Sequence, residues 1–216
     1  MLSRPGTIIT EVTLNHEFLM SSFLTDSERA LANRGLARAI VGVDANCGND
    51  MRVMVGGLGL GYTAAEVLKS TRVGFVEVVE FLPEVIGWTQ DGLTPLSDVL
   101  QSDQRLSISP GDIYARLAEP ATEAFALIII DVDHSPEDVL GEQSREFYSR
   151  AGLQAAMKHL VPGGVLGIWS YAEDSPLLAV MQGIFDDVEV EQVTAWNELI
   201  HENNTDWLFF GRRRRE

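Results

Sequence analysis

The chain has 216 residues, of which 45% are hydrophobic and 8 are prolines. This length and composition are typical of one well-buried globular domain with a small appendage, and they exclude an intrinsically disordered protein. The longest unbroken apolar run, residues 124–130, is too short to span a bilayer, and residues 1–5 do not begin a signal peptide. The single cysteine, Cys47, excludes an internal disulfide. We therefore expect a cytoplasmic protein with no membrane partner.

The net charge of −16 is large for a chain of this size. Such a negative field repels a nucleic-acid backbone and attracts cationic small molecules, so we expect no nucleic-acid partner. An acid excess with few lysines, here Lys69 and Lys158, is also typical of adaptation to high salt. The simpler interpretation is that the charge serves solubility, because net charge affects solubility before it affects substrate choice. The basic run at residues 212–215 is interpreted as a solvated tail.

The N-terminal residues have the pattern of a β-hairpin followed by a helix. Residues 7–14 alternate between apolar and polar side chains, and residues 15–16 are turn formers. Residues 17–22 are then expected to form the second strand of the hairpin. Residues 25–28 provide capping side chains for a helix that runs through an alanine-rich stretch to about Val41. We therefore predict a short β-hairpin and a helix before the main domain.

A polar loop around Gly48 separates this N-terminal unit from the rest of the chain. We predict two parts, residues 1–48 and residues 49–216. In the second part strands and helices alternate, which is typical of an α/β fold with a mostly parallel sheet and right-handed crossovers. A helix at 177–185 and two closing strands are expected to end the chain in an antiparallel hairpin. The predicted strands are 52–56, 74–79, 105–109, 124–131, 164–169, 188–193 and 207–211, and the other predicted helices are 63–70, 83–89, 113–117 and 144–159, the last stopped by Pro162, Gly163 and Gly164.

A glycine-rich turn follows the first strand of this second part. The apolar residues 53–55 run into GGLGLG at residues 56–61, and a second apolar strand ends at Glu80. Glycines let the backbone approach a ligand closely, and the acid can accept hydrogen bonds from two ribose hydroxyls. The pattern indicates a Rossmann-like nucleoside-binding unit; a purely structural turn is the alternative. Residues 59–64 fit the dinucleotide pattern G-x-G-x-x-A, and residues 57–61 fit the G-x-G-x-G turn of S-adenosylmethionine enzymes.

Ligands bind beyond the carboxyl ends of the strands in open α/β sheets, and two further strand ends carry acids. Asp112 either accepts from an adenine amino group or caps the helix that begins at Ile113. Asp131 ends the most apolar strand, a position that suits a general base or a residue that holds a cation. Asp133 and His134 follow it, but this local cluster has no partner ligand elsewhere, so we predict no metal. The candidate catalytic residues are Asp131, Asp133 and His134, and the candidate nucleoside-binding residues are Gly57, Gly59, Gly61, Glu80, Phe81, Asp112, Ile113 and Asp131.

Six sequence blocks in order resemble a known family. They are the glycine turn at 56–61, VVE at 78–80 with PEVI at 83–86, GD at 111–112, IID at 129–131, SREFY at 144–148 and LVPGGVL at 160–166. Residues 53–169 thus resemble the catalytic domain of spermidine synthases, a branch of the class I methyltransferase fold. The N-terminal hairpin and helix resemble the end of that family's small β-domain, here much shortened.

The resemblance implies aminopropyl transfer to an amine, with S-adenosylmethionine or its decarboxylated form as co-substrate. It also implies a small-molecule partner, possibly a cationic amine, and a homodimer, because members of the family commonly pair. Asp131 would hold or deprotonate the attacking nitrogen. The nucleoside-binding role then falls to the predicted domain at residues 49–216.

Several positions depart from the family pattern. Gly59 stands where the family has an aspartate that helps to bind the amine, and Phe81 replaces the acid that follows the ribose-binding glutamate. The first acid of the catalytic loop, Asp131, is kept, whereas the second is displaced or replaced by His134. Residues 26–27 are Asp-Ser instead of the expected tyrosine and glutamine or histidine. The nucleoside site is therefore largely retained, and the acceptor site is atypical.

The sequence is compatible with four functions. The leading hypothesis is a spermidine synthase-like transferase, and the strongest rival enzyme is an S-adenosylmethionine-dependent methyltransferase on the same scaffold. A non-catalytic nucleoside-binding homologue belongs to a different functional class, and the kept Asp131 argues against it. An NAD-dependent oxidoreductase is least favoured, because Tyr148 has Gly152 and not a lysine four residues on.

Overall fold

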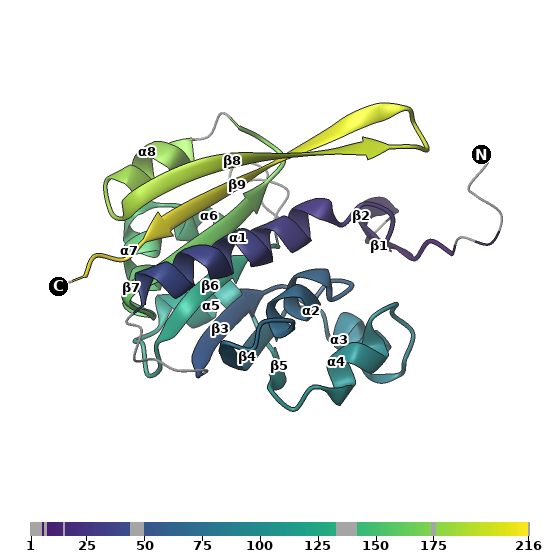
Figure 1. Ribbon diagram of the computed structural model, residues 1–216, viewed down its shortest axis with the longest axis horizontal. Coiled ribbons are helices and arrows are strands. Elements are labelled where there is room, and N and C mark those ends of the chain that lie inside the picture. Colours follow the sequence, from purple (N-terminus) through teal and green to yellow (C-terminus); the bar gives the residue numbers. More distant parts are fainter. Residues whose placement is uncertain are drawn as a thin grey trace.

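The structure is a computed structural model that describes residues 6, 8–14, 16–43, 50–132, 142–173 and 176–215. Within this part of the chain, the main sheet has seven strands in the order β5-β4-β3-β6-β7-β9-β8 (Figure 1). Their bounds are β3 Met51–Gly56, β4 Val73–Glu80, β5 Leu106–Pro110, β6 Phe125–Ile130, β7 Leu160–Ser170, β8 Asp186–Asn197 and β9 Glu202–Arg212. The predicted mostly parallel sheet is confirmed.

The strand order reverses between β3 and β6. Strands β4 and β5 lie to one side of β3, whereas β6 and β7 lie to the other, and all four neighbouring pairs are parallel. The register places Gly56 of β3 beside Ile130 of β6, so the residues that follow these two strands meet at the same edge. Strand β9 runs antiparallel to β7 and to β8, which confirms the predicted terminal hairpin. Open α/β sheets bind ligands at such a reversal.

Helices cover both faces of the sheet, and this explains why its central strands are apolar without alternation. In β6, Leu127 and Ile129 pack into one core cluster, whereas Ile128 and Ile130 pack into the other. No helix in the described part of the chain is long and apolar enough to cross a membrane. The first face carries α1 Asp26–Gly42, α2 Tyr62–Leu68, α3 Pro83–Gln90 and α4 Ser97–Ser102, and the second carries α5 Ile113–Ala118, α6 Glu142–Phe147, α7 Arg150–Lys158 and α8 Pro176–Gln182.

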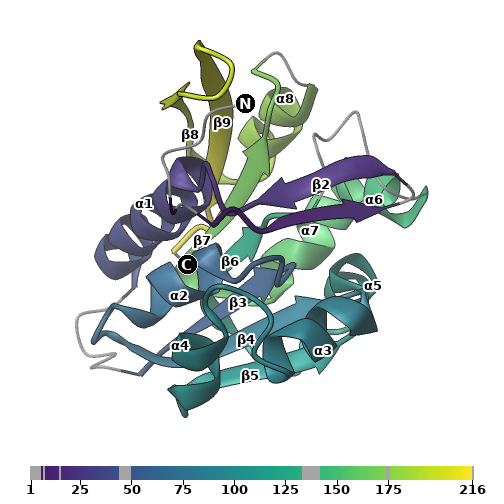
Figure 2. The ribbon, with the colours of Figure 1, turned by 90° about the vertical axis from the view of Figure 1, so that its right-hand side faces the viewer.

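The N-terminal hairpin of β1 (Glu11–Leu14) and β2 (Glu17–Ser21) forms a small sheet of its own. It lies across the end of the main sheet at which the parallel strands finish (Figure 2). Helix α1, in contrast, packs on the main sheet through buried side chains such as Leu31 and Leu36. A domain boundary near residue 48 stays a prediction, because residues 44–49 lie outside the described residues.

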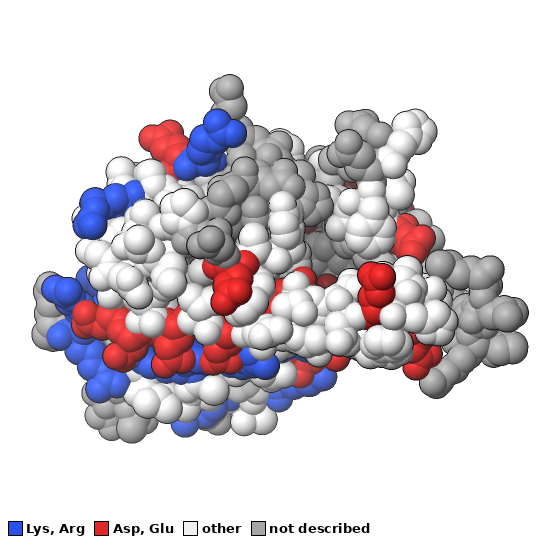
Figure 3. Space-filling view, turned by 90° about the horizontal axis from the view of Figure 1, so that it is seen from above, with Lys and Arg blue, Asp and Glu red and all other residues white. Residues whose placement is uncertain are grey.

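Ion pairs join α1 to the terminal hairpin of β8 and β9, called the outer hairpin below. Arg34 contacts Glu191 at 2.7 Å, and Arg38 pairs with both Glu189 and Glu191. Seen from above, acidic and basic side chains lie in adjacent rows on this face (Figure 3). The pairs are partly exposed, so each adds little stability.

The predicted helix at 144–159 is wrong, because two helices occupy this region. Ser149 has an extended backbone, and its hydroxyl accepts a hydrogen bond from the N–H of Gly152 at 3.2 Å. This is an N-cap, so α6 ends before Ser149 and α7 begins after it. Serine is a common N-cap residue, but the apolar residues on both sides of Ser149 have a helical spacing. This spacing led to the prediction of one continuous helix.

Three further features of the structure also differ from the predictions. Helix α4 was not predicted, and residues 162–164 lie inside β7 instead of in a turn before it. Strands β8 and β9 extend well beyond the predicted ranges 188–193 and 207–211. The extensions are partly exposed on both faces, so their hydrophobic pattern is weak. They form strands because β8 and β9 pair with each other along this part of the hairpin.

Candidate nucleoside site and acidic pocket

A cavity of about 1040 Å³ lies at the carboxyl ends of the parallel strands. Its floor is the glycine turn at 57–61, and its walls include the ends of β4 and β6 and the start of α5. The hairpin β1–β2 and the outer hairpin β8–β9 contribute further lining residues. The cavity therefore brings together all of the described residues that the sequence predicted as functional. They are Gly57, Gly59, Gly61, Glu80, Phe81, Asp112, Ile113 and Asp131.

The backbone of the turn favours glycine at several positions, of which Gly57 and Gly59 are two. Gly57 has φ +88°, and a Cβ there would lie 2.6 Å from the carbonyl oxygen of Asp131. Gly59 has φ +51°, and its Cβ position lies 3.3 Å from Sδ of Met20. These conformations strain any L side chain. The turn can therefore present bare backbone to a ligand, as the sequence pattern predicted.

Glu80 is buried, with 6% of its surface exposed, and its carboxylate holds the glycine turn. Oε2 accepts a hydrogen bond from the backbone N–H of Leu58 at 2.7 Å, and Oε1 accepts one from Leu82 at 2.8 Å. The sequence predicted a ribose ligand at Glu80 but not this backbone role. Carboxylate oxygens have further acceptor capacity, so the ribose contact stays a prediction. The neighbouring Phe81 is 66% exposed and lines the cavity.

Asp112 is the N-cap of α5. Its Oδ1 accepts from the backbone N–H of Tyr114 at 2.8 Å and of Ala115 at 3.4 Å, which is the capping alternative that the sequence left open. Ile113 is buried beneath the turn, and a Cβ on Gly56 would lie 2.7 Å from its Cγ1. Asp112 also lines the cavity, and its contact with an adenine stays a prediction.

Asp131 lies directly after β6, next to the glycine turn. Its backbone N–H donates to the carbonyl of Gly56 at 3.1 Å, and its Oδ2 accepts from the hydroxyl of Thr63 at 2.7 Å. Burial raises the pKa of Asp131 to about 6, the hydrogen bond from Thr63 opposes this rise, and the charge of Asp206 adds to it. A pKa near neutrality suits a general base. Asp133 and His134 lie outside the described residues.

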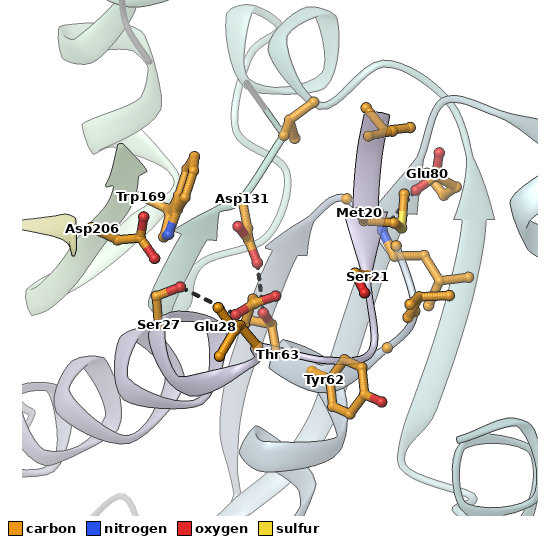
Figure 4. Close-up of a pocket in the computed structure, with 18 of the residues that line it drawn as sticks. Met20, Ser21, Ser27, Glu28, Tyr62, Thr63, Glu80, Asp131, Trp169 and Asp206 are labelled. Atoms are coloured by element: carbon orange, nitrogen blue, oxygen red, sulfur yellow. Dashed lines mark hydrogen bonds between the residues drawn. The ribbon is translucent and has the colours of Figure 1, made fainter. Parts of the chain in front are cut away.

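Two further acids face Asp131, and sequence reasoning missed both of them. Glu28 comes from α1 and Asp206 from β9, and Figure 4 shows their side chains beside Asp131 and Thr63 in the cavity. Burial raises the pKa of Glu28 to about 7, with a further rise from the charge of Asp131. Burial also raises the pKa of Asp206. No local pattern marks Glu28 and Asp206 because the contacts are between distant elements.

The cavity is acidic as a whole. None of the described residues that line it is a lysine, an arginine or a histidine. Within the part of the chain that the structure describes, no cluster of histidine, cysteine and acidic residues is arranged to hold a metal ion, and the expected absence of a metal stays a prediction. Because its described lining has acidic and no basic side chains, the cavity favours a ligand with positive charge. The acidic lining residues are Glu11, Asp26, Glu28, Glu80, Asp112, Asp131 and Asp206.

The architecture is shared with solved structures of known proteins, although no protein-family model matches the sequence. A spermidine synthase in complex with the transition state analogue AdoDATO superposes with a TM-score of 0.69 at 17% identity, over 95% of this chain and 67% of that chain. The spermidine synthase of Thermotoga maritima gives 0.65 at 16% identity, over 95% and 65%. Human methyltransferase-like protein 13 in complex with SAH gives 0.61 at 17% identity, over 86% and 82%.

The chain has a spermidine synthase-like, class I methyltransferase fold. The fold class that the sequence predicted is thereby confirmed, including the short hairpin and helix before the sheet. The chain spans about two thirds of the length of the two spermidine synthases, with 67% and 65% of their residues covered. At identities this low the likeness establishes the fold, and function has to be argued from the site.

Proposed function

We propose that this protein is an aminopropyltransferase that uses decarboxylated S-adenosylmethionine and a cationic amine. The glycine turn and Glu80 supply the nucleoside site, and two proteins of the same fold were solved with AdoDATO and with SAH. The observation that carries the proposal is the charge of the cavity, whose described lining contains many carboxylates and no basic side chain.

This charge favours the decarboxylated co-substrate over S-adenosylmethionine itself. The carboxylate of S-adenosylmethionine would enter a cavity that offers it no cationic side chain among the described residues, close to acids that repel it. The backbone N–H of Leu58, at the glycine turn, already donates to Glu80. Decarboxylated S-adenosylmethionine lacks this carboxylate and carries only positive charges, on the sulfonium and on the primary amine.

The acceptor side of the site is the cluster of Glu28, Asp131 and Asp206. An acceptor amine would enter as an ammonium ion and give one proton to Asp131. Its nitrogen then attacks the carbon of the aminopropyl group that is bonded to sulfur. The bond between this carbon and sulfur breaks, and its electron pair moves to sulfur. The products are neutral methylthioadenosine and a secondary ammonium ion, which the remaining carboxylates hold. The protein contributes position and charge complementarity.

Putrescine is not the expected acceptor. Gly59, Asp26 and Ser27 replace the side chains that the spermidine synthase resemblance assigns to the amine, and Met20 lies against Gly59. Glu28 and Asp206 add further carboxyl groups to the acceptor side of the cavity. We therefore expect weak or absent spermidine formation from putrescine. An enzyme that turned over putrescine efficiently would show that this reading of the acceptor side is wrong.

A methyltransferase is the second candidate, because human methyltransferase-like protein 13 shares the fold over 82% of its own chain. The two functions differ in the co-substrate that the cavity has to accept. Calorimetric titration of the protein with decarboxylated S-adenosylmethionine, S-adenosylmethionine and methylthioadenosine separates them. We expect the decarboxylated form to bind at least 10-fold more tightly than S-adenosylmethionine, about 1.4 kcal/mol. Equal or reversed affinities would favour a methyltransferase.

A further inference from the structure

Thr63 connects the glycine turn to the proposed base. It is the second residue of α2, directly after the turn, and only 5% of its surface is exposed. Its hydroxyl donates to Oδ2 of Asp131 at 2.7 Å, across the edge at which β3 and β6 end side by side (Figure 4). Thr63 also lines the cavity. The family resemblance and the sequence patterns assigned it no role.

The surroundings of Asp131 work against its ionisation. Glu28 faces it from α1 and Asp206 from β9, and both are acidic. Burial acts in the same direction. Among the described residues, the hydrogen-bond donor to the carboxylate is Thr63, and its bond lowers the pKa of Asp131 against these effects. Without that donor, a larger share of Asp131 would be protonated near neutral pH and unable to accept a proton.

We propose that Thr63 is a positioning residue, whose hydroxyl fixes the Asp131 carboxylate in one orientation and keeps it ionised for the acceptor amine. This inference deepens the proposed function, because the acceptor rests on that proposal. The bond uses Oδ2 and leaves Oδ1 for the amine. A hydroxyl also stabilises the anion without adding a charge, whereas an arginine or lysine partner would repel a cationic acceptor and a sulfonium.

Two substitutions separate the hydroxyl from the shape of the side chain. Thr63→Val keeps the branched shape and removes the donor, whereas Thr63→Ser keeps the donor. Thr63→Ala removes the donor with a smaller side chain and serves if the valine variant does not fold. Thr89→Val is the matched control, because Thr89 is 1% exposed on α3 and does not line the cavity.

The titration of Asp131 tests the inference without any substrate. The carboxyl carbon is followed by NMR in protein labelled with ¹³C at aspartate, and the signal is assigned by its loss in Asp131→Asn. We expect Thr63→Val and Thr63→Ala to raise the titration midpoint by about one pH unit, the shift expected from one hydrogen bond to a carboxylate. Thr63→Ser and Thr89→Val should titrate as the parent does. Asp206→Asn should shift the midpoint downward, because it removes a repelling charge.

The inference is overturned if the midpoint in Thr63→Val and Thr63→Ala equals that of the parent, or if Thr63→Ser shifts as much as they do. If transferase activity is found, the acid limb of its pH profile should move upward with the midpoint, with nucleoside affinity unchanged. A shifted midpoint in a protein without aminopropyl transfer would contradict the proposed function but not the action of Thr63 on Asp131. The two failures are therefore distinguishable.

Discussion

The carboxylate of Glu80 accepts a hydrogen bond from the backbone N–H of Leu58 at 2.7 Å and so ties the end of β4 to the glycine turn after β3. A second bond, from the N–H of Leu82 at 2.8 Å, fixes the residues that follow β4. The acid that the sequence marks for a ribose therefore also shapes the floor of the cavity. Loss of its side chain should affect folding and binding together.

Glu80→Ala should weaken the binding of methylthioadenosine and also lower the free energy of unfolding. Two backbone N–H groups would lose their acceptor, which costs about 1–3 kcal/mol, and binding should lose a similar amount. Urea unfolding and calorimetric titration measure the two effects. Glu77→Ala on the same strand, away from the cavity, is the control for a lost carboxylate. Unchanged nucleoside affinity in Glu80→Ala would show that the nucleoside does not occupy this site.

Gly59→Val should abolish nucleoside binding and leave the core folded. The positive φ strains a branched side chain, and the added atoms would meet Met20 of the N-terminal hairpin. Gly87→Ala on α3 is the control, because a Cβ at Gly87 meets no atom within 4 Å. Calorimetry with methylthioadenosine and far-UV circular dichroism separate binding from folding. Parent-like affinity in Gly59→Val would place the ligand elsewhere.

Asp131→Asn should reduce turnover by about 10²–10⁴-fold, because it removes the proposed base and keeps the shape of the side chain. Nucleoside affinity should stay nearly unchanged. The measurement is methylthioadenosine release with an amine that serves as acceptor, and Asp98→Asn, an exposed position on α4, is the control. If Asp131→Asn were as active as the parent, Asp131 would be a structural acid at the end of a strand.

Glu28→Gln should stabilise the protein at alkaline pH. The pKa of Glu28 is raised to about 7 from an ordinary value of 4.5, so between these values the folded state binds more protons than the unfolded state. The contribution of Glu28 to stability therefore falls as pH rises from about 4.5 to about 7. At pH 8, Glu28→Gln should raise the free energy of unfolding by roughly 2 kcal/mol.

The stability gain from Glu28→Gln should disappear near pH 4.5, where the glutamate is already neutral in both states. Urea unfolding at both pH values measures this difference. The control is Glu84→Gln, at an exposed position on α3, which should change stability little at either pH. An equal effect of Glu28→Gln at pH 4.5 and pH 8 would mean that Glu28 is not held against ionisation.

Local sequence patterns determined the fold class and much of the candidate nucleoside site. The glycine turn, the acid at Glu80 and the strand that leads to Asp131 are each encoded within a few neighbouring residues, and the parallel sheet brings such strand ends to one edge. The break at Ser149 and the length of the β8–β9 hairpin were not predicted, because a single cap and exposed strands leave little hydrophobic pattern.

Only the tertiary structure decided the acidic cluster. Glu28, Asp131 and Asp206 lie far apart in the sequence, on α1, after β6 and on β9, and only the folded chain brings them to one cavity. Their raised pKa values depend on burial and on one another's charge, and the opposing bond from Thr63 exists only where α2 meets the end of β6. A sequence names the carboxylates, whereas their charge state follows from the distances and solvent exclusion that folding creates.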